Sequence, residues 1–546
     1  MARERSDQQI PGIVFQPHSQ RGMQRGIEKI VAAIRPTLGP IHGVVVNEKQ
    51  SKVGVPELLD DGAIIARRII QLPDRDEDMG AMYLRQMLWT LHDSVGDGTA
   101  TAAVIFSTIY HKGLMYLASG GNAMRLRQIL EQATDSILSE LESKTFFIEG
   151  KDAFVKLAET ICYDSELARM LGEIFDVIGE FGRLEIQTGR GLTLEREYFE
   201  GIYLDGAVFS REMIPDPKAG KAQLENTAIL LTDLEISDHE IMLQVLESAV
   251  KANVKSLLLV AKAISERALS VLLMKQNQEK IRVVAVKTPG MSSDDNREAL
   301  EDLAILAGGR PFLQAASDSL LNIQASDFGF ARRAWADHQY FGISGGKGDP
   351  RQMRQHINTL RSVFANSDNP QRRKHLQERI GKLLGGSAIL YIGNPSPITT
   401  QVRKELAERT AEAMRGALRS GVLPGGGIAL LACKKALLEK SRQAKELDER
   451  AAYRILAAAV EAPFQALLQN AGENPYELLP QIINAGQEYG YDVVQRCTVH
   501  MAGAGIVDSA AVIREVVYRA IHAAALALTV DVLVHRAKPP DAFHTT

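Results

Sequence analysis

Gly96-Asp97-Gly98-Thr99-Ala100-Thr101 is the first of two short stretches that decide how this chain is built, and Leu423-Pro424-Gly425-Gly426-Gly427 is the second. Each stretch stands at the start of a helical pattern. A carboxylate beside a glycine turn at a helix N-terminus offers backbone N–H groups to phosphate oxygens and an anionic oxygen to a divalent metal. Together they predict a magnesium–nucleotide site that both ends of the chain build. Taken alone, such an Asp-Gly turn is more often an ordinary helix start.

The composition predicts a multidomain protein of a reducing compartment. At 546 residues the chain exceeds the size at which one core keeps growing, so about two to four domains are expected. Charged residues make up 24% and the net charge is -4, so no general field favours nucleic acid or a membrane, and we expect neither partner. The three cysteines form no C-x-x-C pair and the N-terminus lacks an apolar signal core, so the expected location is cytoplasmic.

Periodicity divides the chain into helical ends and an α/β middle. Apolar residues recur at helical spacing over residues 19–35, 99–116 and 123–141, and helix dominates again from residue 401. Short apolar runs at 228–231, 256–261 and 281–286 predict buried strands between helical segments. The predicted fold class is mainly α with an inserted α/β domain. Gly201 and Gly385-Gly386 flank the insert and are candidate hinges, although ordinary turns explain them equally well.

Seven motifs follow one another in a fixed order: Thr37-Leu-Gly-Pro, Asp61-Gly-Ala-Ile-Ile-Ala-Arg, Gly96-Asp-Gly-Thr-Ala-Thr, Leu376-Gln-Glu-Arg, Leu384-Gly-Gly, Gly421-Val-Leu-Pro-Gly-Gly-Gly and Gly505-Ile-Val-Asp. In this order they resemble the group I (GroEL-type) chaperonins of the TCP-1/chaperonin-60 family across nearly the whole chain. The resemblance implies an ATP-dependent chaperone that binds non-native polypeptides in the cavity of stacked seven-membered rings. It also implies three domains: equatorial and ATP-binding (1–144 and 420–546), intermediate (145–200 and 387–419), and apical and polypeptide-binding (201–386).

The resemblance also assigns the nucleotide contacts. It makes Asp97 the Mg²⁺ ligand. The remaining contacts to ATP are Thr37, Leu38, Gly39 and Pro40 in one turn, Gly98, Thr99, Ala100 and Thr101 at the phosphates, Gly425 and Gly426 beside the ribose, and Asp492 and Asp508. Taken alone, Asp508 is equally compatible with a helix N-cap.

Asp61 matches a catalytic carboxylate that faces the γ-phosphate and helps to position water or a monovalent cation such as K⁺. Its neighbour Asp60 stands where the family has a lysine or a neutral residue. A second carboxylate near phosphates adds repulsion unless it points to solvent, so weaker nucleotide affinity is expected.

The position of the family's catalytic aspartate falls on Arg409. A guanidinium carries no acceptor and stays protonated, so it cannot orient water as a base, but it can pair with a phosphate. Glu408 is a possible substitute, although it points about 100° away on a helix. Alternatively, Arg409 pairs with Glu405 or Glu412 on a solvated face. In each case we expect slow or absent hydrolysis.

Two apolar helical patterns in the insert match the family's polypeptide-binding helices. The matching residues are Val208, Met213, Leu243, Leu246, Leu269, Leu273 and Met274. Without the resemblance, such an apolar stripe on a helix more often belongs to the hydrophobic core. Glu212 stands where the family often has an aromatic residue, which puts binding of a lid co-chaperonin in doubt. The expected partners are non-native polypeptides and further copies of the chain, in homo-oligomeric or mixed rings; the alternative is a non-cycling holdase or scaffold.

Overall fold

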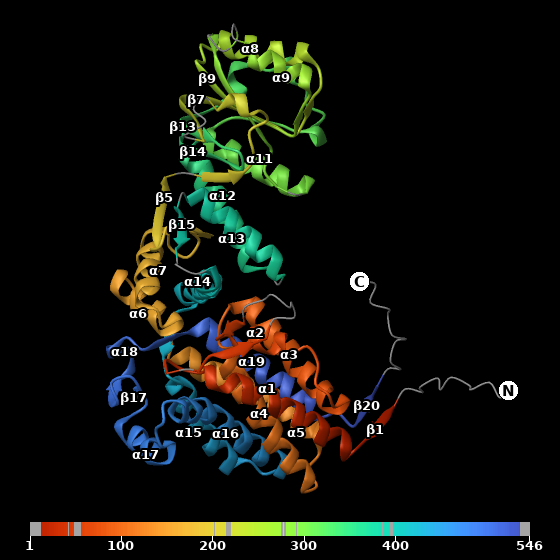
Figure 1. The fold of residues 1–546 in the computed structure, drawn as a ribbon, viewed down its shortest axis with the longest axis vertical. Helices are drawn as coiled ribbons and strands as arrows, with labels where there is room; N and C mark the ends of the chain where they lie inside the picture. The colour runs from red at the N-terminus through yellow and green to blue at the C-terminus, as the bar shows by residue number, and fades with distance from the viewer. Residues whose placement is uncertain are drawn as a thin grey trace, which may run out of the picture. The chain divides into compact units, whose positions relative to one another are not determined.

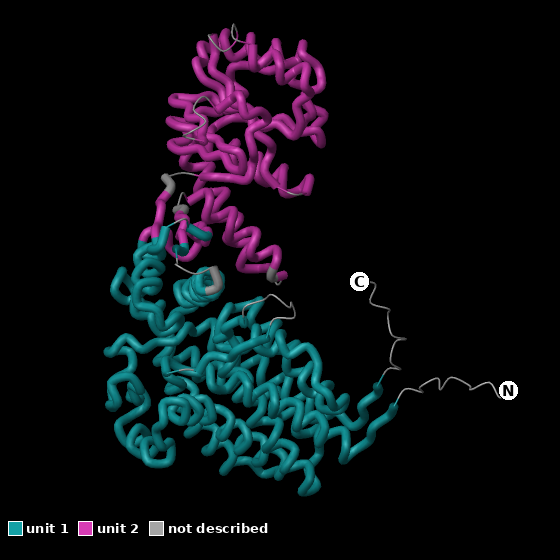
Figure 2. Tube along the Cα trace, in the orientation of Figure 1, with its two compact units in different colours: residues 1–176, 188–194, 392–546 teal, residues 177–187, 195–391 magenta. Residues whose placement is uncertain are grey.

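The structure is a computed structural model that describes residues 12–41, 43–48, 56–189, 191–200, 202–214, 220–274, 277, 280–290, 292–367, 369–384, 386–393 and 397–535. The chain divides into two compact units (Figure 2). Unit 1 comprises residues 1–176, 188–194 and 392–546, and unit 2 comprises residues 177–187 and 195–391. Two of the candidate hinge residues, Gly201 and Gly385, lie outside the described residues.

Unit 1 is mainly helical. Its helices are α1 (His18–Ile34), η1 (Arg35–Thr37), α2 (Gly62–Arg68), α3 (Arg75–Val95), α4 (Thr99–Ala118), α5 (Ala123–Ser143), α6 (Lys151–Cys162), α7 (Ser165–Ile178, which ends in unit 2), α14 (Pro397–Ser420), α15 (Ile428–Gln443), α16 (Leu447–Asn470), α17 (Pro475–Ala485), α18 (Met501–Ala504) and α19 (Ala510–Ala527). The predicted helices over 19–35, 99–116 and 123–141 are confirmed as α1, α4 and α5.

The two ends of the chain form one core in unit 1. α16 packs against α4 and α5, and α19 packs against α3, α4 and α5, so helices from both ends lie side by side (Figure 1). Leu88, Phe106 and Val516 are fully buried where these helices meet. Close-packed apolar contact of this extent is the main favourable term in folding.

Four short antiparallel strand pairs complete unit 1. β1 (Ile13–Phe15) pairs with β20 (Val532–Val534), β2 (Val45–Asn47) with β3 (Glu57–Leu59), β16 (Val422–Pro424) with β19 (Val507–Ser509), and β17 (Tyr489–Asp492) with β18 (Cys497–His500). The β16–β19 pair joins the second glycine turn to the Gly505-Ile-Val-Asp motif, which are about 80 residues apart in the sequence.

Unit 2 is the predicted α/β insert. Its main sheet has the order β11-β9-β7-β13-β14-β6, with β12 also paired to β7. The strands are β6 (Ile202–Asp205), β7 (Ala222–Thr232), β9 (Ser256–Ala261), β11 (Arg282–Lys287), β12 (Pro311–Phe312), β13 (Gly329–Ala336) and β14 (Tyr340–Gly346). The apolar runs at 228–231, 256–261 and 281–286 are therefore confirmed as strands.

Helices cover both faces of this sheet. Alternate residues of the strands belong to two different apolar clusters, because successive side chains of a strand point to opposite faces. One cluster includes residues of α11 (Ser293–Ala307), α12 (Pro350–Ala365) and α13 (Pro370–Leu384), and the other includes residues of α8 (His239–Lys251) and α9 (Glu266–Leu273). α8 and α9 lie side by side (Figure 1).

The remaining elements of unit 2 are short. β4 (Arg183–Thr188), β15 (Gly386–Ile392) and β5 (Glu195–Glu200) form a three-stranded sheet, and β8 (Glu235–Ile236) pairs with β10 (Ala263–Ile264). The 3₁₀ turns are η2 (Arg211–Met213), η3 (Gln314–Ala316), η4 (Leu320–Asn322) and η5 (Ala325–Asp327). Among the described residues, no helix combines the length and the apolar composition needed to span a bilayer.

Candidate functional site

Asp97 lies in a tight turn between two long helices. Gly96 ends α3 with φ +73 and Gly98 precedes α4 with φ +81, a left-handed conformation that favours glycine at both positions. The first hydrogen bond of α4 runs from the Ala102 N–H to the Gly98 carbonyl. The three N–H groups that precede Ala102 therefore lie outside the hydrogen-bond ladder of the helix and can receive an anion. They belong to Thr99, Ala100 and Thr101.

The β16–β19 pair brings Asp508 to the second glycine turn. Asp508 lies opposite Leu423 in the ladder, and the Gly425 N–H donates to the Ile506 carbonyl at 2.9 Å. A Cβ placed on Gly425 would lie 3.1 Å from the Asp508 carboxylate. Glycine at this position therefore lets the backbone approach the acid closely.

Asp97 and Asp508 interact electrostatically although they come from opposite ends of the chain. Burial raises the pKa of Asp97, and burial together with the charge of Asp97 raises the pKa of Asp508 to about 7. Neither carboxylate forms an ion pair with a basic side chain of the described residues. Two buried acids whose charges act on each other fit a divalent cation. Mg²⁺ binds at sites of one or two carboxylates plus phosphate oxygens.

Asp61 is the most connected acid of the site. It caps α2 by accepting the Ile64 N–H at 2.9 Å, and its second oxygen accepts the Thr99 hydroxyl at 3.3 Å. His92 Nδ1 lies 3.6 Å from Asp61 Oδ1. Burial alone would raise the pKa of Asp61, but the interaction with His92 and the charge of Arg409 outweigh it and lower the pKa to about 2.

Arg409 extends from the middle of α14 to the corner between β3 and α2. Its Nη2 donates to Asp60 Oδ2 at 2.7 Å and its Nη1 donates to Asp61 Oδ2 at 3.3 Å. The expectation that Arg409 pairs with Glu405 or Glu412 on its own helix is wrong, because these two acids bond to Gln401 and Arg415. The long side chain reaches a denser cluster of negative charge than its own helix offers.

Asp60 and Glu408 also differ from expectation. Asp60 does not point freely into solvent, because Arg409 neutralises it, so the expected repulsion toward phosphates is reduced. Glu408 is half-exposed and lies 3.8 Å from Lys404, so it is turned toward its own helix surface rather than toward Asp61. Glu408 therefore does not occupy the place of the missing aspartate.

The turn Thr37–Pro40 is held in place by its neighbours. The Thr37 hydroxyl donates to the last turn of α1, and Gly39 has φ +94. The Asn470 side chain, at the end of α16, donates to the Leu38 carbonyl at 2.9 Å. A helix from the far end of the chain thus fixes a turn from the near end, as the resemblance requires.

Asp492 lies in the β17–β18 hairpin. Its Oδ1 accepts the N–H groups of Val494 and Gln495, so this oxygen closes the hairpin. Met501 connects the hairpin to the glycine turn, because its side chain fills the space that a Cβ on Gly426 would enter. The hairpin that carries Asp492 is thereby packed, through Met501, against the second glycine turn.

His92 is the site residue that sequence reasoning missed. It stands in the last turn of α3 with its ring stacked on Trp89, at 5.3 Å between ring centroids. The interaction with Asp61 raises the pKa of His92. The only feature of the sequence that points to His92 is its position five residues before Asp97, and this position does not identify Asp61 as its partner.

The predicted polypeptide-binding residues divide into two groups in unit 2. Leu243 and Met274 are exposed, with 41% and 54% of their surface accessible, and Leu269 and Leu273 are partly exposed. The others are buried in the cores of the unit: Val208, Met213 and Leu246. We define the accessible apolar face as Leu243, Leu269, Leu273 and Met274. Met213 and Leu246 lie in the apolar cluster that includes α8 and α9, whereas Val208 belongs to the cluster on the opposite face of the sheet.

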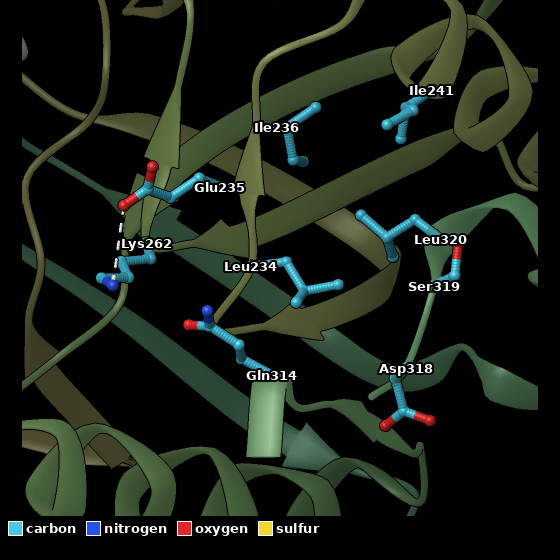
Figure 3. Close-up of a pocket in the computed structure, with 9 residues that line it drawn as sticks. All are labelled: Leu234, Glu235, Ile236, Ile241, Lys262, Gln314, Asp318, Ser319 and Leu320. Atoms are coloured by element: carbon cyan, nitrogen blue, oxygen red, sulfur yellow. Dashed lines mark ion pairs between the residues drawn. The ribbon is translucent and has the colours of Figure 1, made fainter. Parts of the chain in front are cut away.

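A pocket of about 360 Å³ lies at the N-terminal end of α8 (Figure 3). Leu234, Ile236, Ile241 and Leu320 give it an apolar lining. Glu235 and Lys262 form an ion pair at one edge, and the polar residues Gln314, Asp318 and Ser319 complete the rim. This mixed lining can accept an apolar side chain beside a polar backbone.

Comparisons with known proteins identify the fold and the family of this chain. The structure is similar to the chaperonin gp146 from bacteriophage EL 2 (Pseudomonas aeruginosa), crystallised in the presence of ATP-BeFx, with a TM-score of 0.69 and 18% sequence identity over 96% of this chain and 99% of that chain. The sequence profile of the TCP-1/cpn60 chaperonin family matches residues 30–538. The chain belongs to the TCP-1/cpn60 chaperonin family.

Proposed function

We propose that this chain is a subunit of an ATP-binding chaperonin that captures non-native polypeptides and hydrolyses ATP slowly. The observation that carries the proposal is the pair of buried, interacting acids, Asp97 and Asp508, of which Asp97 lies in the turn before the open N-terminus of α4. The gp146 chaperonin was crystallised with an ATP analogue, which supports the same use of this site here.

The residues present fit a magnesium nucleotide. Asp97 would hold Mg²⁺, and the first N–H groups of α4 would receive the phosphates. Gly425 leaves room for a ribose beside Asp508, which would accept its hydroxyl hydrogen bonds. Bound Mg²⁺ supplies positive charge against the phosphates, while Asp61 would orient water or a monovalent cation such as K⁺ at the γ-phosphate.

The architecture of the family supports three domains in the subunit. We assign residues 1–144 and 420–546 to an equatorial domain, 145–200 and 387–419 to an intermediate domain, and 201–386 to an apical domain. The family also supports ring-shaped homo-oligomers in the cytoplasm, seven subunits to a ring, with mixed rings as a variant. The apolar face of Leu243, Leu269, Leu273 and Met274 would hold exposed apolar segments of unfolded clients.

Slow cleavage follows from Arg409. The guanidinium has no acceptor and occupies Asp61 Oδ2, the acid that would orient water. A second candidate function is a holdase or scaffold that binds ATP without cycling, and the same ion pair favours it. Phosphate release measured with and without an unfolded client separates the two: stimulation by the client supports a cycling chaperonin, and no release supports the holdase.

The decisive variant is Asp97→Ala, with Asp93→Ala as the matched control because Asp93 is an acid on the preceding helix, outside the turn. We expect Asp97→Ala to weaken MgATP binding by at least about tenfold, as loss of groups around a metal does, and the control to leave it unchanged. Fluorescence titration measures the affinity, and negative-stain images with and without ATP show whether sevenfold rings form and change. Equal affinities for both variants would remove the proposed site.

A further inference from the structure

Arg409 and Asp60 carry opposite charges and form an ion pair. Their bond of 2.7 Å joins α14 to the residue after β3, about 350 positions away in the sequence. The Arg409 side chain is 14% exposed and that of Asp60 26% exposed, so water screens the pair only in part. Such a pair fixes two elements more firmly than a surface ion pair does.

The backbone of α14 at Arg409 also touches the Asp97 turn. A Cβ on Gly96 would lie 3.0 Å from the Arg409 carbonyl oxygen and 3.4 Å from its Cα. Arg409 therefore packs its backbone against the metal-binding turn and extends its side chain to the corner that carries Asp60 and Asp61. A shift of α14 would move both contacts together.

The polarity of this pair is reversed relative to the family resemblance, which places an acid at position 409 and a lysine or neutral residue at position 60. Replacing Arg409 alone by an acid would place three carboxylates side by side, because Asp60 and Asp61 already meet there. Loss of Arg409 alone therefore leaves the charges of Asp60 and Asp61 uncompensated, and a lysine introduced at position 60 alone would stand beside the Arg409 guanidinium.

We propose that Asp60 and Arg409 form one functional unit, an α14 clamp, that positions the helix on the Asp97 turn and holds Asp61 Oδ2 away from water. The clamp is a positioning device, and its effect on cleavage rests on the proposed ATP-binding function. An acid at position 409 can act only if the negative charge at position 60 is replaced at the same time. Arg409→Asp alone is therefore insufficient to raise hydrolysis.

The test is a charge-reversal cycle in the full chain: Asp60→Lys, Arg409→Asp and the double variant. We expect each single change to lower the thermal unfolding temperature. The double variant should regain at least half of the summed loss, because the introduced lysine and the introduced aspartate form the same ion pair with its polarity reversed. Phosphate release should rise in the double variant alone, by roughly 100-fold, the lower end of what a positioned general base contributes.

A matched control uses another arginine of α14. Arg403 bonds to Asp164 and Glu166, away from Asp60, so Arg403→Ala combined with Asp60→Lys should show additive losses. If a charge-reversed single variant does not fold, the cycle of Asp60→Asn and Arg409→Gln gives the same coupling from milder changes.

The outcomes separate the clamp from the proposed function. Additive losses in the charge-reversal or the milder cycle would overturn the clamp. Restored stability and intact MgATP binding without faster phosphate release would overturn its role in holding Asp61. If no variant, including the natural chain, binds MgATP, the proposed function fails, while the stability cycle still decides whether Asp60 and Arg409 form one unit.

Discussion

Gly98→Ala tests whether the turn between α3 and α4 depends on a glycine. Gly98 has φ +81, and an L-residue in the left-handed region costs about 1–2 kcal/mol. An added Cβ would lie 2.5 Å from Val516 Cγ2 and 2.8 Å from Val512 Cγ1, both on buried positions of α19. Overpacking of a well-filled core costs about 1–3 kcal/mol. The free energy of unfolding should therefore fall by about 2–5 kcal/mol.

Gly120→Ala is the matched control, because Gly120 has φ +99 but no atom within 4 Å of an added Cβ. It should lose only the backbone cost of about 1–2 kcal/mol. Urea denaturation of both variants isolates the packing contribution, and Val516→Ala combined with Gly98→Ala should be less destabilised than the sum of the single changes. A Gly98→Ala loss equal to that of Gly120→Ala would refute the reasoning, because the turn would then absorb the methyl group.

Four further substitutions test the rest of the site and unit 2. Burial raises the pKa of Asp508 to about 7, so its ionisation destabilises the folded chain as pH rises from 3.8 to about 7. Asp508→Asn should therefore be more stable than the natural chain at pH about 8, but not near pH 4. Urea denaturation at both pH values measures the difference. Arg403→Ala should lower the free energy of unfolding by about 1–3 kcal/mol, measured by denaturation, because it leaves the partly buried Asp164 without its bidentate partner; a loss near zero would mean that water replaces the arginine. Leu243→Ser, at an exposed position, should reduce suppression of client aggregation with little change in stability. Leu246→Ser, at a buried position, should destabilise unit 2 by at least about 2 kcal/mol. Similar stabilities of the two variants would contradict the division into exposed and buried residues.

Local patterns predicted the elements of the fold well. The helix over 123–141 is confirmed as α5, which Asn122 caps by accepting the Arg125 N–H. The apolar run at 256–261 is confirmed as β9, an interior strand between β11 and β7. Periodicity, caps and β-branched runs act within a few residues, so the sequence shows them directly.

Contacts between distant residues were less predictable. The sequence offered Glu405 and Glu412 as partners of Arg409, because helix spacing identifies only neighbours on the same helix. The observed partners, Asp60 and Asp61, are brought there by tertiary packing. His92 was missed for the same reason.

Apolar residues posed the same difficulty in unit 2. The resemblance gave one set of seven polypeptide-binding residues, but Val208, Met213 and Leu246 are buried. A helical stripe shows which side chains share a face and not how far that face sinks into the core. The burial of Met213 and Leu246 depends on how α8 and α9 pack on the sheet, and a sequence pattern does not specify that packing.

The distribution of charge explains how binding and cleavage can be separated within one site. Asp97 and Asp508 form no ion pair with a basic side chain among the described residues, although the charge of Arg409 acts on Asp97, and under the proposed function they would favour a divalent cation. Arg409 is already neutralised by Asp60 and Asp61, so its charge is committed to the protein itself. Under the proposed function, the groups that would bind the nucleotide lie in the Asp97 turn, at the start of α4 and on β19, and those that would govern water lie at the start of α2 and on α14. Sequence changes confined to the second set can therefore reduce cleavage while the first set still binds.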